Sequence, residues 1–553
     1  MGTGSAMTAA AQEESLGSFD YVVVGAGSAG CVLANRLSEG GRRRVAILEA
    51  GGQDNWIWFH IPVGYLYAMG NPRADWCYKT EAEPGLNGRA LNYPRGKVIG
   101  GCSSINGMIY MRGQAGDYDH WRQLGNKGWA WDEVLPYFLK SEDQGRGEDP
   151  LHATGGEWRV EDLRLRWDVL DCFRDAASEH GIPKVDDFNR GTNEGCTYFQ
   201  VNQRRGRRVS TAGAFLKPAL ARDNLALFTE AQALEITFEG RRASGLRLRH
   251  KGKVKRIEAA AGVILSAGAI NSPHLLMHSG IGPAEQLGAH GIAVRQDQAG
   301  VGANLQDHLQ LRSIFKVSGM KTLNTQMQSL FGKAAVGLRY ALMRRGPMTM
   351  APSQLGAFTR SSPEYELPNL EYHVQPLSLE KFGEPLHAFD AFTASVCNLR
   401  PASRGALRLK SSDPLEPPAI QPNYLSDPAD QRVAADAIRL TRRIVLESEA
   451  FRPYKPEEYL PGPSLQSEAE LVRAAGDIGT TIFHPVGTCR MGSEPDAVVD
   501  DRLRLRGFEG LRVVDASIMP TITSGNTNSP TIMIAEKAVA MIAEDEALRQ
   551  AAE

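Results

Sequence analysis

The stretch from Phe19 to Glu49 restricts the possible folds of this chain more than any other. A short apolar run, Tyr21 to Val24, is typical of a strand buried on both faces, and it leads into the pattern G-x-G-x-x-G and a helix-forming segment. A second apolar run, Val45 to Leu48, then ends at the acid, at the spacing expected for a βαβ unit. Strand, glycines, helix, strand and acid in this register predict a binding site for an adenine dinucleotide.

Each glycine of the pattern has a physical task. Gly25 allows the tight turn, Gly27 lets the backbone approach a pyrophosphate, and Gly30 lets helix and strand pack closely. The helix N-terminus offers free N–H groups and a partial positive charge to that anion. The carboxylate of Glu49 can accept a hydrogen bond from a ribose hydroxyl, and it would repel a 2′-phosphate. The unit does not distinguish FAD from NAD.

Length and composition set the broad class of protein. The chain of 553 residues is too long to form one ordinary hydrophobic core, so we expect two or three domains. Hydrophobic residues at 42% and charged residues at 23% are typical of a soluble globular protein, and a net charge of -2 gives no reason to expect nucleic acid as a partner. The seven scattered cysteines suit a reducing compartment. No run approaches the ~18 apolar residues of a membrane span, and Met1 to Gly17 resemble neither a secretory signal nor a transit peptide. We predict a cytoplasmic protein.

Two glycine-rich segments carry further signals. The first is Arg95 to Gly113, RGKVIGGCSSINGMIYMRG, and the second is Gly268 to Gly282, GAINSPHLLMHSGIG. By composition alone, the first could equally be a loop without function. Together they resemble the two signatures of the glucose-methanol-choline (GMC) oxidoreductases, a family of FAD-dependent alcohol oxidases and dehydrogenases. The similarity runs from about Phe19 to Ile542 and points to the choline dehydrogenase and aliphatic alcohol dehydrogenase branch.

The resemblance implies an α/β fold (α+β overall). In it, a Rossmann-type FAD-binding domain is combined with a discontinuous substrate-binding domain built on an antiparallel sheet. Alternating runs at Asn369 to Gln375 and Ala406 to Lys410 support such a sheet, and Ala429 to Leu446 predict a charged helix. We predict FAD-binding segments at 19–160, 201–308 and 479–545, and substrate-binding segments at 161–200 and 309–478.

Two C-terminal segments carry the residue types that alcohol oxidation requires. TTIFHPVGTCRMG places His484 in an irregular turn, and a glycine- and asparagine-rich turn before the last helix contains Asn526. Removing a hydroxyl proton near neutrality requires a group such as imidazole, whose ordinary pKa is about 6.5. Steadying the alkoxide requires a donor that does not ionise, such as asparagine. The resemblance implies that His484 is the base, Asn526 its partner, and Phe483 a neighbour of the isoalloxazine ring.

The resemblance also implies which residues contact FAD, whose N5 accepts the hydride. Some family oxidases attach FAD covalently to a histidine at the position of Ile105, so we predict non-covalent FAD here. The predicted cofactor residues are Gly25, Gly27, Ser28, Ala29, Gly30, Glu49, Ala50, Val98, Gly101, Ser103, Asn106, Gly107, Met108, Ile109, Ala233, Ala267, Phe483, Asp515, Ala516, Asn526 and Thr527.

Other reactions occur on this scaffold. Fatty acid photodecarboxylases lack the catalytic histidine and place a cysteine immediately before an Arg-Pro pair. Here Leu399 precedes that pair, Cys397 is out of register, and His484 is present. Hydroxynitrile lyases of this family also use histidine, so a flavin-dependent lyase is an alternative function. We favour oxidation of a primary alcohol to an aldehyde, with a quinone, a cytochrome or oxygen as the external electron acceptor.

Three further histidines are interpreted as structural. His274 and His278 have the i, i+4 spacing of metal ligands, but no third ligand is near in sequence, so we predict no metal site. His308, in NLQDHL, is interpreted as a satisfied buried histidine.

One amphipathic segment allows two interpretations. Apolar residues recur at helical spacing from Met327 to Leu342, with Lys333, Arg339, Arg344 and Arg345 nearby. A basic amphipathic helix can lie on the inner membrane surface as a peripheral contact. A helix packed on its own domain has the same pattern, and that interpretation is the favoured one.

Overall fold

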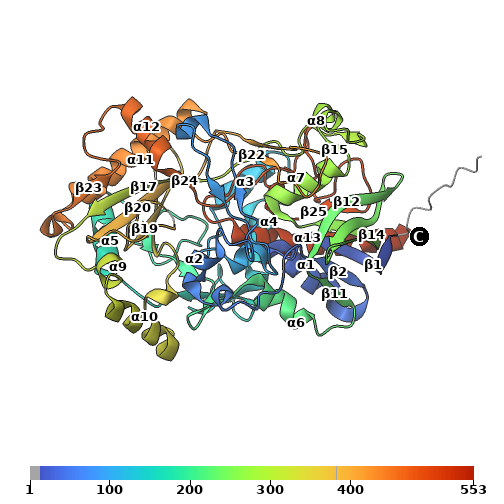
Figure 1. Cartoon of the computed structure of the whole chain (residues 1–553), viewed down its shortest axis with the longest axis horizontal. Coiled ribbons are helices and arrows are strands. Elements are labelled where there is room, and N and C mark those ends of the chain that lie inside the picture. The colour runs from blue at the N-terminus through green and yellow to red at the C-terminus, as the bar shows by residue number, and fades with distance from the viewer. Residues whose placement is uncertain (1–12, 382, 553) are drawn as a thin grey trace, which may run out of the picture.

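Two seven-stranded sheets organise the molecule, one in each half of the view in Figure 1. The computed structural model describes residues 13–381 and 383–552. Residues 1–12, which hold most of the N-terminal segment interpreted above, lie outside the described residues. Within the described part of the chain, no helix combines the length and apolar character needed to cross a membrane.

The first sheet has the order β11–β2–β1–β14–β13–β12, and β25 pairs with the C-terminal end of β14. β1, β2, β11 and β25 run parallel, and their apolar runs are buried because α1 (Ser28–Ser38) and α13 (Asn528–Ala552) pack together against the sheet. The predicted βαβ unit is present. The strands are β1 (Glu14–Val24), β2 (Val45–Leu48), β11 (Leu225–Phe228), β12 (Ala231–Glu239), β13 (Arg242–His250), β14 (Lys253–Leu265) and β25 (Leu511–Val513).

The second sheet is antiparallel, as predicted, in the order β23–β17–β20–β19–β18–β7, with β24 beside β17. α5 (Asp168–Glu179) and α11 (Pro428–Leu446) pack on one face, where Leu311 and Phe315 of β17 join the apolar core. The strands are β7 (Gly195–Tyr198), β17 (Leu309–Lys316), β18 (Leu355–Thr359), β19 (Leu370–Gln375), β20 (Ala391–Asn398), β23 (Glu457–Leu460) and β24 (Gly479–Thr481).

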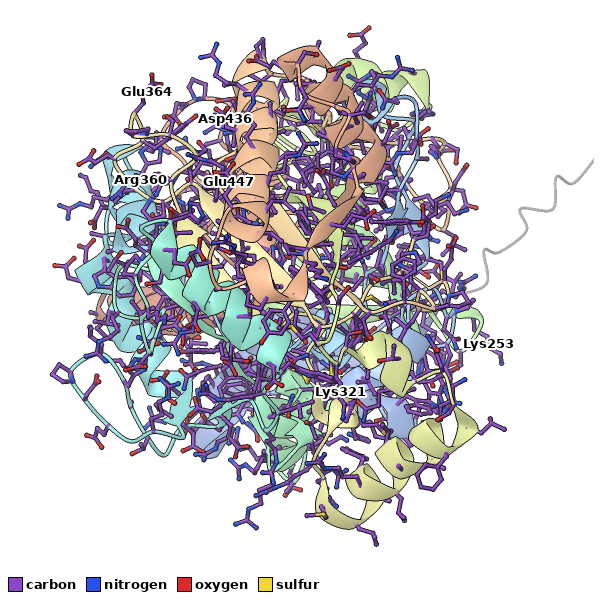
Figure 2. All side chains as sticks on the ribbon, turned by 90° about the vertical axis from the view of Figure 1, so that its left-hand side faces the viewer. Lys253, Lys321, Arg360, Glu364, Asp436 and Glu447 are labelled. Carbon is purple, nitrogen blue, oxygen red and sulfur yellow. The ribbon has the colours of Figure 1, made fainter. Side chains whose placement is uncertain are left out.

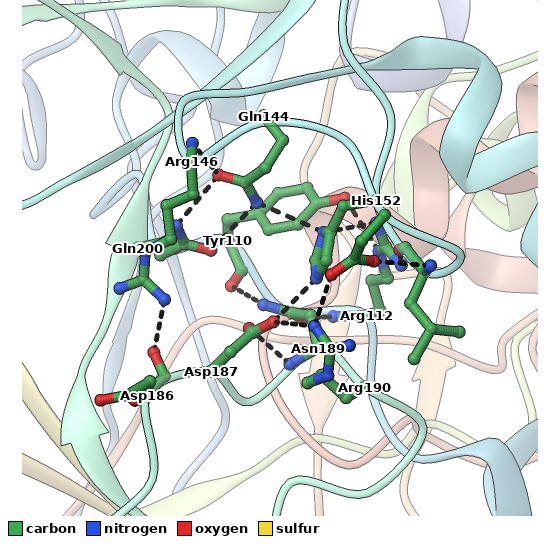
Figure 3. A network of polar contacts seen from close by, with 12 residues as sticks. Tyr110, Arg112, Gln144, Arg146, His152, Asp186, Asp187, Asn189, Arg190 and Gln200 are labelled. Carbon is green, nitrogen blue, oxygen red and sulfur yellow. Dashed lines mark hydrogen bonds and ion pairs between the residues drawn. The ribbon is translucent and has the colours of Figure 1, made fainter.

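A buried polar cluster around Arg112 connects several loops to the small sheet of β5 (Glu142–Gln144), β6 (Trp158–Asp162) and β8 (Gln200–Val201) (Figure 3). The Arg112 guanidinium lies 2.8 Å from Glu142 and donates to the hydroxyl of Tyr110. His152 bridges Glu142 and Asp187, with ring nitrogens 3.1 and 2.7 Å from the two carboxylates. Every charge of this cluster therefore meets an opposite charge or a hydrogen-bond partner.

α10 (Leu330–Met343) projects from the lower left of the molecule in Figure 1, and in the turned view of Figure 2 it lies at the lower edge with its side chains pointing outward. Its apolar side chains are exposed: Leu330 and Phe331 at 84%, Leu342 at 75%, with Val336 as the buried residue of the helix. The interpretation of a helix packed through its apolar face on its own domain is therefore wrong. Amphipathic spacing in the sequence predicts that a helix has an apolar face, but it does not predict whether the rest of the chain covers that face.

Shorter elements complete the fold. The remaining helices are α2 (Tyr65–Ala68), α3 (Ala115–Gln123), α4 (Trp131–Ser141), α6 (Lys217–Ala219), α7 (Gly268–His278), α8 (Ala284–Ala289), α9 (Leu323–Gln326) and α12 (Glu468–Ile478). The remaining strands are β3 (Tyr78–Lys79), β4 (Asn92–Tyr93), β5 (Glu142–Gln144), β6 (Trp158–Asp162), β8 (Gln200–Val201), β9 (Gln203–Arg204), β10 (Arg207–Arg208), β15 (Ile281–Gly282), β16 (Gln296–Asp297), β21 (Ala406–Arg408) and β22 (Ala419–Gln421).

Candidate functional site

A long cavity lies between the two sheets and brings most of the predicted site residues together. Its walls come from the turn after β1, the first signature segment, the ends of β2 and β14, and the C-terminal turn before α13. The predicted residues that line it are Gly25, Gly27, Ser28, Ala29, Glu49, Ala50, Gly101, Asn106, Gly107, Met108, Ile109, Ala233, Ala267, Phe483, His484, Asp515, Ala516, Asn526 and Thr527.

Three predicted residues lie behind the cavity wall. A Cβ on Gly30 would come within 1.8 Å of the Gly25 carbonyl oxygen, so this glycine provides the close contact of helix and strand. Val98 is buried and bridges Gly52, while the Ser103 hydroxyl donates to the Gly100 carbonyl. They support the turns that form the wall, without lining the cavity.

The dinucleotide end has the backbone shape that a bound pyrophosphate needs. Gly25 has a φ of +100°, and a Cβ there would lie 2.5 Å from the Ser266 carbonyl oxygen. Gly101 has a φ of +51°, and its Cβ would lie 2.7 Å from the Cα of Gly27. Only glycine fits both positions, because the two glycine-rich segments touch through their backbones. This cradle fits a dinucleotide.

Glu49 is held in place by the backbone beside this cradle. Its two carboxylate oxygens accept from the N–H groups of Ala26, at 3.0 Å, and Gly51, at 2.8 Å. Burial raises the pKa of Glu49 to about 7, against the effect of these hydrogen bonds. Each oxygen keeps a lone pair for a ribose hydroxyl.

The other end of the cavity brings His484 and Asn526 together. Nε2 of His484 and Nδ2 of Asn526 lie 3.1 Å apart. His484 directly follows Phe483, which has a φ of +70°, and Asn526 lies two residues before α13. The Asp117 carboxylate, on α3, fixes the second turn by accepting from the N–H and the hydroxyl of Ser524, both at 2.7 Å. The predicted pair is therefore a spatial pair.

His308 is buried and hydrogen-bonded, as predicted, and it also contacts His484. The Nδ1 atoms of the two rings lie 3.1 Å apart, and Nε2 of His308 lies 3.1 Å from the Leu399 carbonyl oxygen. A carbonyl only accepts, so Nε2 of neutral His308 carries the hydrogen and its Nδ1 accepts. Nδ1 of His484 must then donate, which leaves the lone pair of its Nε2 directed toward Asn526 and the cavity.

Sequence reasoning missed Asp307, which anchors both histidines. One carboxylate oxygen accepts from the backbone N–H groups of His484, at 2.7 Å, and His308, at 2.9 Å. The other accepts from the hydroxyls of Tyr93, Tyr424 and Thr481. Its place beside His308 in the sequence was visible, but the contact with a residue 177 positions away was not.

The environment of His484 keeps its ring neutral. Burial lowers the pKa of His484 well below its ordinary value, and the neighbouring His308 and His373 rings lower it further. Burial likewise lowers the pKa of His308. A neutral imidazole whose Nε2 is an acceptor is the form that can take a proton.

Two other histidine clusters lie near the cavity. His308, Glu371 and Cys397 bring one ligand atom each to within 4.8 Å, but both ring nitrogens of His308 already have hydrogen-bond partners. His274 and His278 line the cavity with their Nε2 atoms 3.0 Å apart, and burial lowers the pKa of His274 to about 3. Their structural interpretation stays a prediction.

Ile105 and Cys397, the residues used above to distinguish related reactions, lie inside and outside the cavity lining, respectively. Ile105 lines the cavity, at the position where a covalent histidine would stand. Cys397 is buried outside the residues that line the cavity, and burial raises the pKa of its thiol well above the ordinary value. A thiol in this setting is not a reactive group of the cavity.

Comparison with known sequences gives two kinds of match. A family model described as GMC oxidoreductase matches residues 19–310, and a second with the same description matches residues 401–535. An alcohol dehydrogenase (acceptor) of Pseudomonas putida is 41% identical over 528 residues, which are 95% of this chain and 95% of that one. An oxygen-dependent choline dehydrogenase of Brucella anthropi is 41% identical over 521 residues, 94% of each chain.

Solved structures share the fold over nearly the whole chain. Pyridoxine 4-oxidase from Mesorbium loti has a TM-score of 0.86 and 32% identity, covering 95% of this chain and 99% of that one. A formate oxidase of Aspergillus oryzae, solved in a study of FAD modification, has a TM-score of 0.88 and 27% identity, covering 97% and 99%. The fold class predicted from the sequence is confirmed.

Proposed function

Because the chain belongs to the GMC oxidoreductase family, we propose that it oxidises a primary alcohol to an aldehyde, with His484 as the base. Family membership makes it an FAD-binding oxidoreductase that acts on the CH–OH group of a small-molecule donor and passes electrons to an acceptor. The observation that carries the proposal is the Nε2 lone pair of His484, directed at Asn526 and the cavity.

The chain's own residues divide the work at the hydroxyl group. Nε2 of His484 takes the hydroxyl proton, and the amide N–H of Asn526 donates to the oxygen as negative charge develops there. Bound FAD would supply the hydride acceptor at N5. The buried His484 ring is a poor site for a lasting positive charge, so the proton leaves it as the product forms.

Replacing His484 tests the proposal. We expect His484→Ala to lower the rate with an artificial electron acceptor by roughly 10²–10⁴-fold, the usual contribution of a general base. His120→Ala, which changes an exposed histidine of α3, is the matched control and should keep the wild-type rate. An unchanged rate in His484→Ala with full flavin content would remove His484 from this role.

The colour of the flavin separates oxidation from the alternatives. Under anaerobic mixing with an alcohol, a dehydrogenase or oxidase bleaches its flavin, whereas a flavin-dependent lyase does not. A photodecarboxylase-like enzyme would release CO₂ from a fatty acid only in light. The presence of His484 and the position of Cys397 outside the cavity lining favour oxidation.

We also propose that FAD is held without a covalent bond. The cavity offers Ile105 where a covalent histidine would stand, and an isoleucine side chain cannot form that bond. Acid precipitation should leave the yellow colour in solution. Colour retained in the precipitated protein would show a covalent link.

α10 supports a peripheral contact with an anionic membrane surface, which would bring a quinone acceptor within reach of a cytoplasmic enzyme. Its exposed apolar face combines Phe331, Leu338 and Leu342, at 84%, 61% and 75% exposure. Lys333 and Arg339 are also exposed, and neither has an ion-pair partner among the described residues. Apolar and basic side chains together suit insertion between anionic headgroups.

Vesicle sedimentation tests this contact. We expect the holoenzyme to pellet with phosphatidylglycerol vesicles, less with phosphatidylcholine vesicles and less at high salt. The double variant Phe331→Ser/Leu342→Ser should stay in the supernatant, while Leu548→Ser, at a 69% exposed leucine of α13, should behave as wild type. Wild-type protein that ignores both vesicle types would refute the contact.

A further inference from the structure

Polar side chains of the second sheet line the part of the cavity near His484, which we call the substrate end. Gln310 and Arg312 of β17 line the cavity, as do His373 and Gln375 of β19. In the sheet register both Arg312 and His373 pair with Ser395 of β20, so one row of side chains crosses three strands. Strand alternation places these side chains opposite the apolar face that packs on α11.

Arg312 is a buried cation with no partner in the described part of the chain. It is 8% exposed, and its Nε and Nη2 atoms are buried without a hydrogen bond. No carboxylate of the described residues forms an ion pair with it. Burial lowers the pKa of Arg312 to about 10, so the guanidinium remains charged at neutral pH. A buried charge without a protein partner is costly, and at a cavity wall its partner must come from the contents of the cavity, a ligand, an ion or water.

The neighbours of Arg312 share this lack of partners. Both ring nitrogens of His373 lack a hydrogen bond, although Nε2 lies 3.2 Å from a Glu371 oxygen in poor geometry. The Ser395 hydroxyl and both amide atoms of Gln354 are also buried and unpaired. Oε1 of Glu371, which is buried outside the residues that line the cavity, is unpaired as well. These unpaired groups gather on one sheet face, which points to a polar ligand and not to a purely aliphatic one.

The charges along the cavity have an uneven distribution. The two carboxylates that line it, Glu49 and Asp515, belong to the dinucleotide end. At the substrate end the charged residues that line the cavity are Arg95 and Arg312. Arg95 is already engaged, because its guanidinium donates to the carbonyl of Phe483 at 2.6 Å. Arg312 is the cation that remains for a ligand.

We propose that Arg312 binds a carboxylate of the substrate, so that the enzyme oxidises a hydroxy acid whose hydroxyl and carboxylate stand at opposite ends. This inference rests on the proposed function, since it assumes that the hydroxyl reacts at His484. A planar guanidinium can take a carboxylate through two parallel N–H donors. An alcohol with a trimethylammonium group, such as choline, would meet repulsion at the same place.

The strand sets the length of this substrate. His308, which contacts His484, directly precedes β17, and Arg312 lies four residues further along, which corresponds to about 13 Å between the two backbone positions in an extended chain. A substrate that reaches both groups therefore needs a spacer of several carbons between hydroxyl and carboxylate. Glycolate is too short, and a series of ω-hydroxycarboxylates should pass through an optimum of intermediate length.

The first experiment compares alcohols of one length with the holoenzyme. We expect kcat/KM for 6-hydroxyhexanoate to exceed that for 1,6-hexanediol by about 10- to 100-fold, the usual contribution of a charge-assisted hydrogen bond pair. The (6-hydroxyhexyl)trimethylammonium ion should be the poorest of the three. A diol that matches or exceeds the hydroxy acid would overturn the inference.

The second experiment assigns the preference to Arg312. Arg312→Gln should lose the advantage of the hydroxy acid through a higher KM, with kcat little changed, and Arg312→Lys should keep part of it. Lys316→Gln is the matched control, because it removes one positive charge from the same strand outside the cavity lining. If Arg312→Gln keeps the wild-type ratio of kcat/KM values, Arg312 does not bind the carboxylate.

A binding measurement separates this inference from the proposed function. Hexanoate lacks the hydroxyl group, so its binding, followed by the change in flavin absorbance, needs no turnover. We expect wild-type protein to bind hexanoate about 10- to 100-fold more tightly than Arg312→Gln does. The uncharged analogue hexanamide, which has no hydroxyl group to oxidise, should bind to both proteins with similar affinity. Failure of every alcohol to bleach the flavin would refute the oxidation alone. Should Arg312→Gln not fold, weaker binding of hexanoate than of hexanamide by wild-type protein would refute the carboxylate site.

Discussion

Two buried arginines of this protein meet opposite surroundings. The side chain of Arg112 is fully buried and contacts the Glu142 carboxylate at 2.8 Å, the Tyr110 hydroxyl at 3.0 Å and the Leu151 carbonyl at 2.6 Å. Arg312 is nearly as buried but makes no hydrogen bond within the described residues. Burial alone would lower both pKa values. Tyr110 and Glu142 reverse that effect for Arg112, whereas the pKa of Arg312 falls to about 10.

The difference separates a structural charge from a functional one. The chain supplies every partner of Arg112, because that cluster joins segments that must stay together whether or not a ligand is present (Figure 3). It leaves Arg312 beside the cavity without a protein partner, so its desolvation is compensated by the contents of the cavity and not by the fold. Arg112 and Arg312 are both buried arginines, and the number of their hydrogen-bond and ion-pair partners distinguishes them.

The largest effect should follow from breaking the satisfied cluster. Arg112→Met removes the arginine from the fully buried Glu142 carboxylate and leaves His152 as its one ion-pair partner among the described residues. Removing one partner of a buried ion pair typically costs about 3–5 kcal/mol. We expect a large drop in the urea midpoint, followed by tryptophan fluorescence. The double variant Arg112→Met/Glu142→Gln should recover part of the loss, since no unpaired charge remains. A midpoint within error of wild type for the single variant would contradict the contrast.

His308 shares a property with each arginine. Both its ring nitrogens have hydrogen-bond partners, like the groups around Arg112, but one of these partners is the proposed base, His484. His308→Phe removes the acceptor of the His484 Nδ1 hydrogen, so the Nε2 lone pair is no longer guaranteed. We expect kcat to fall roughly 10- to 100-fold, less than the full contribution of a general base, with flavin content unchanged. His308→Gln should restore part of the rate, since its amide can both accept from His484 and donate to Leu399. Equal losses in the two variants would contradict a role in setting the tautomer.

The pH dependence of stability should report the satisfied cluster. Burial alone would lower the pKa of His152, but hydrogen bonds to Asp187 and Glu142 raise it to about 9. A raised pKa stabilises the fold fully below the unfolded value of about 6.5, and this contribution is lost as pH rises from there through about 9. We expect a loss of about 1–3 kcal/mol across that window. In His152→Gln the loss should shrink, and a slope equal to wild type would show that His152 is not its source.

Local sequence patterns predicted those parts of the site that depend on the backbone. The glycine pattern, the βαβ unit and the irregular turn around His484 are properties of short segments, and the structure has them where we expected. Gly30 performs the predicted close packing, although it does not line the cavity. The pairing of His484 with Asn526 followed from the family resemblance, since no spacing rule joins the two turns. The domain boundaries stay predictions.

The partners of side chains could not be predicted, because they depend on sheet register and tertiary contacts. Asp307 is an ordinary acid in the sequence, and its contact with His484 arises only when β17 and β24 pair. Arg312 shows the same limit, since alternation along a strand does not tell which face meets a cavity. The exposed face of α10 is the opposite case: its pattern was clear, and the favoured partner was wrong.

The smallest expected change in stability, that of Arg312→Met, is the most direct test of the difference between the two arginines. Arg312→Met removes a buried cation that has no partner, so the fold loses no hydrogen bond and no longer contains a desolvated charge. We expect the urea midpoint to stay within about 1 kcal/mol of wild type or to rise slightly, the opposite of the result for Arg112→Met. Addition of hexanoate should stabilise wild-type protein and leave Arg312→Met unchanged, because only the former offers the carboxylate a partner. A loss of stability as large as that of Arg112→Met would mean that Arg312 also has partners within the fold and is a structural charge like Arg112.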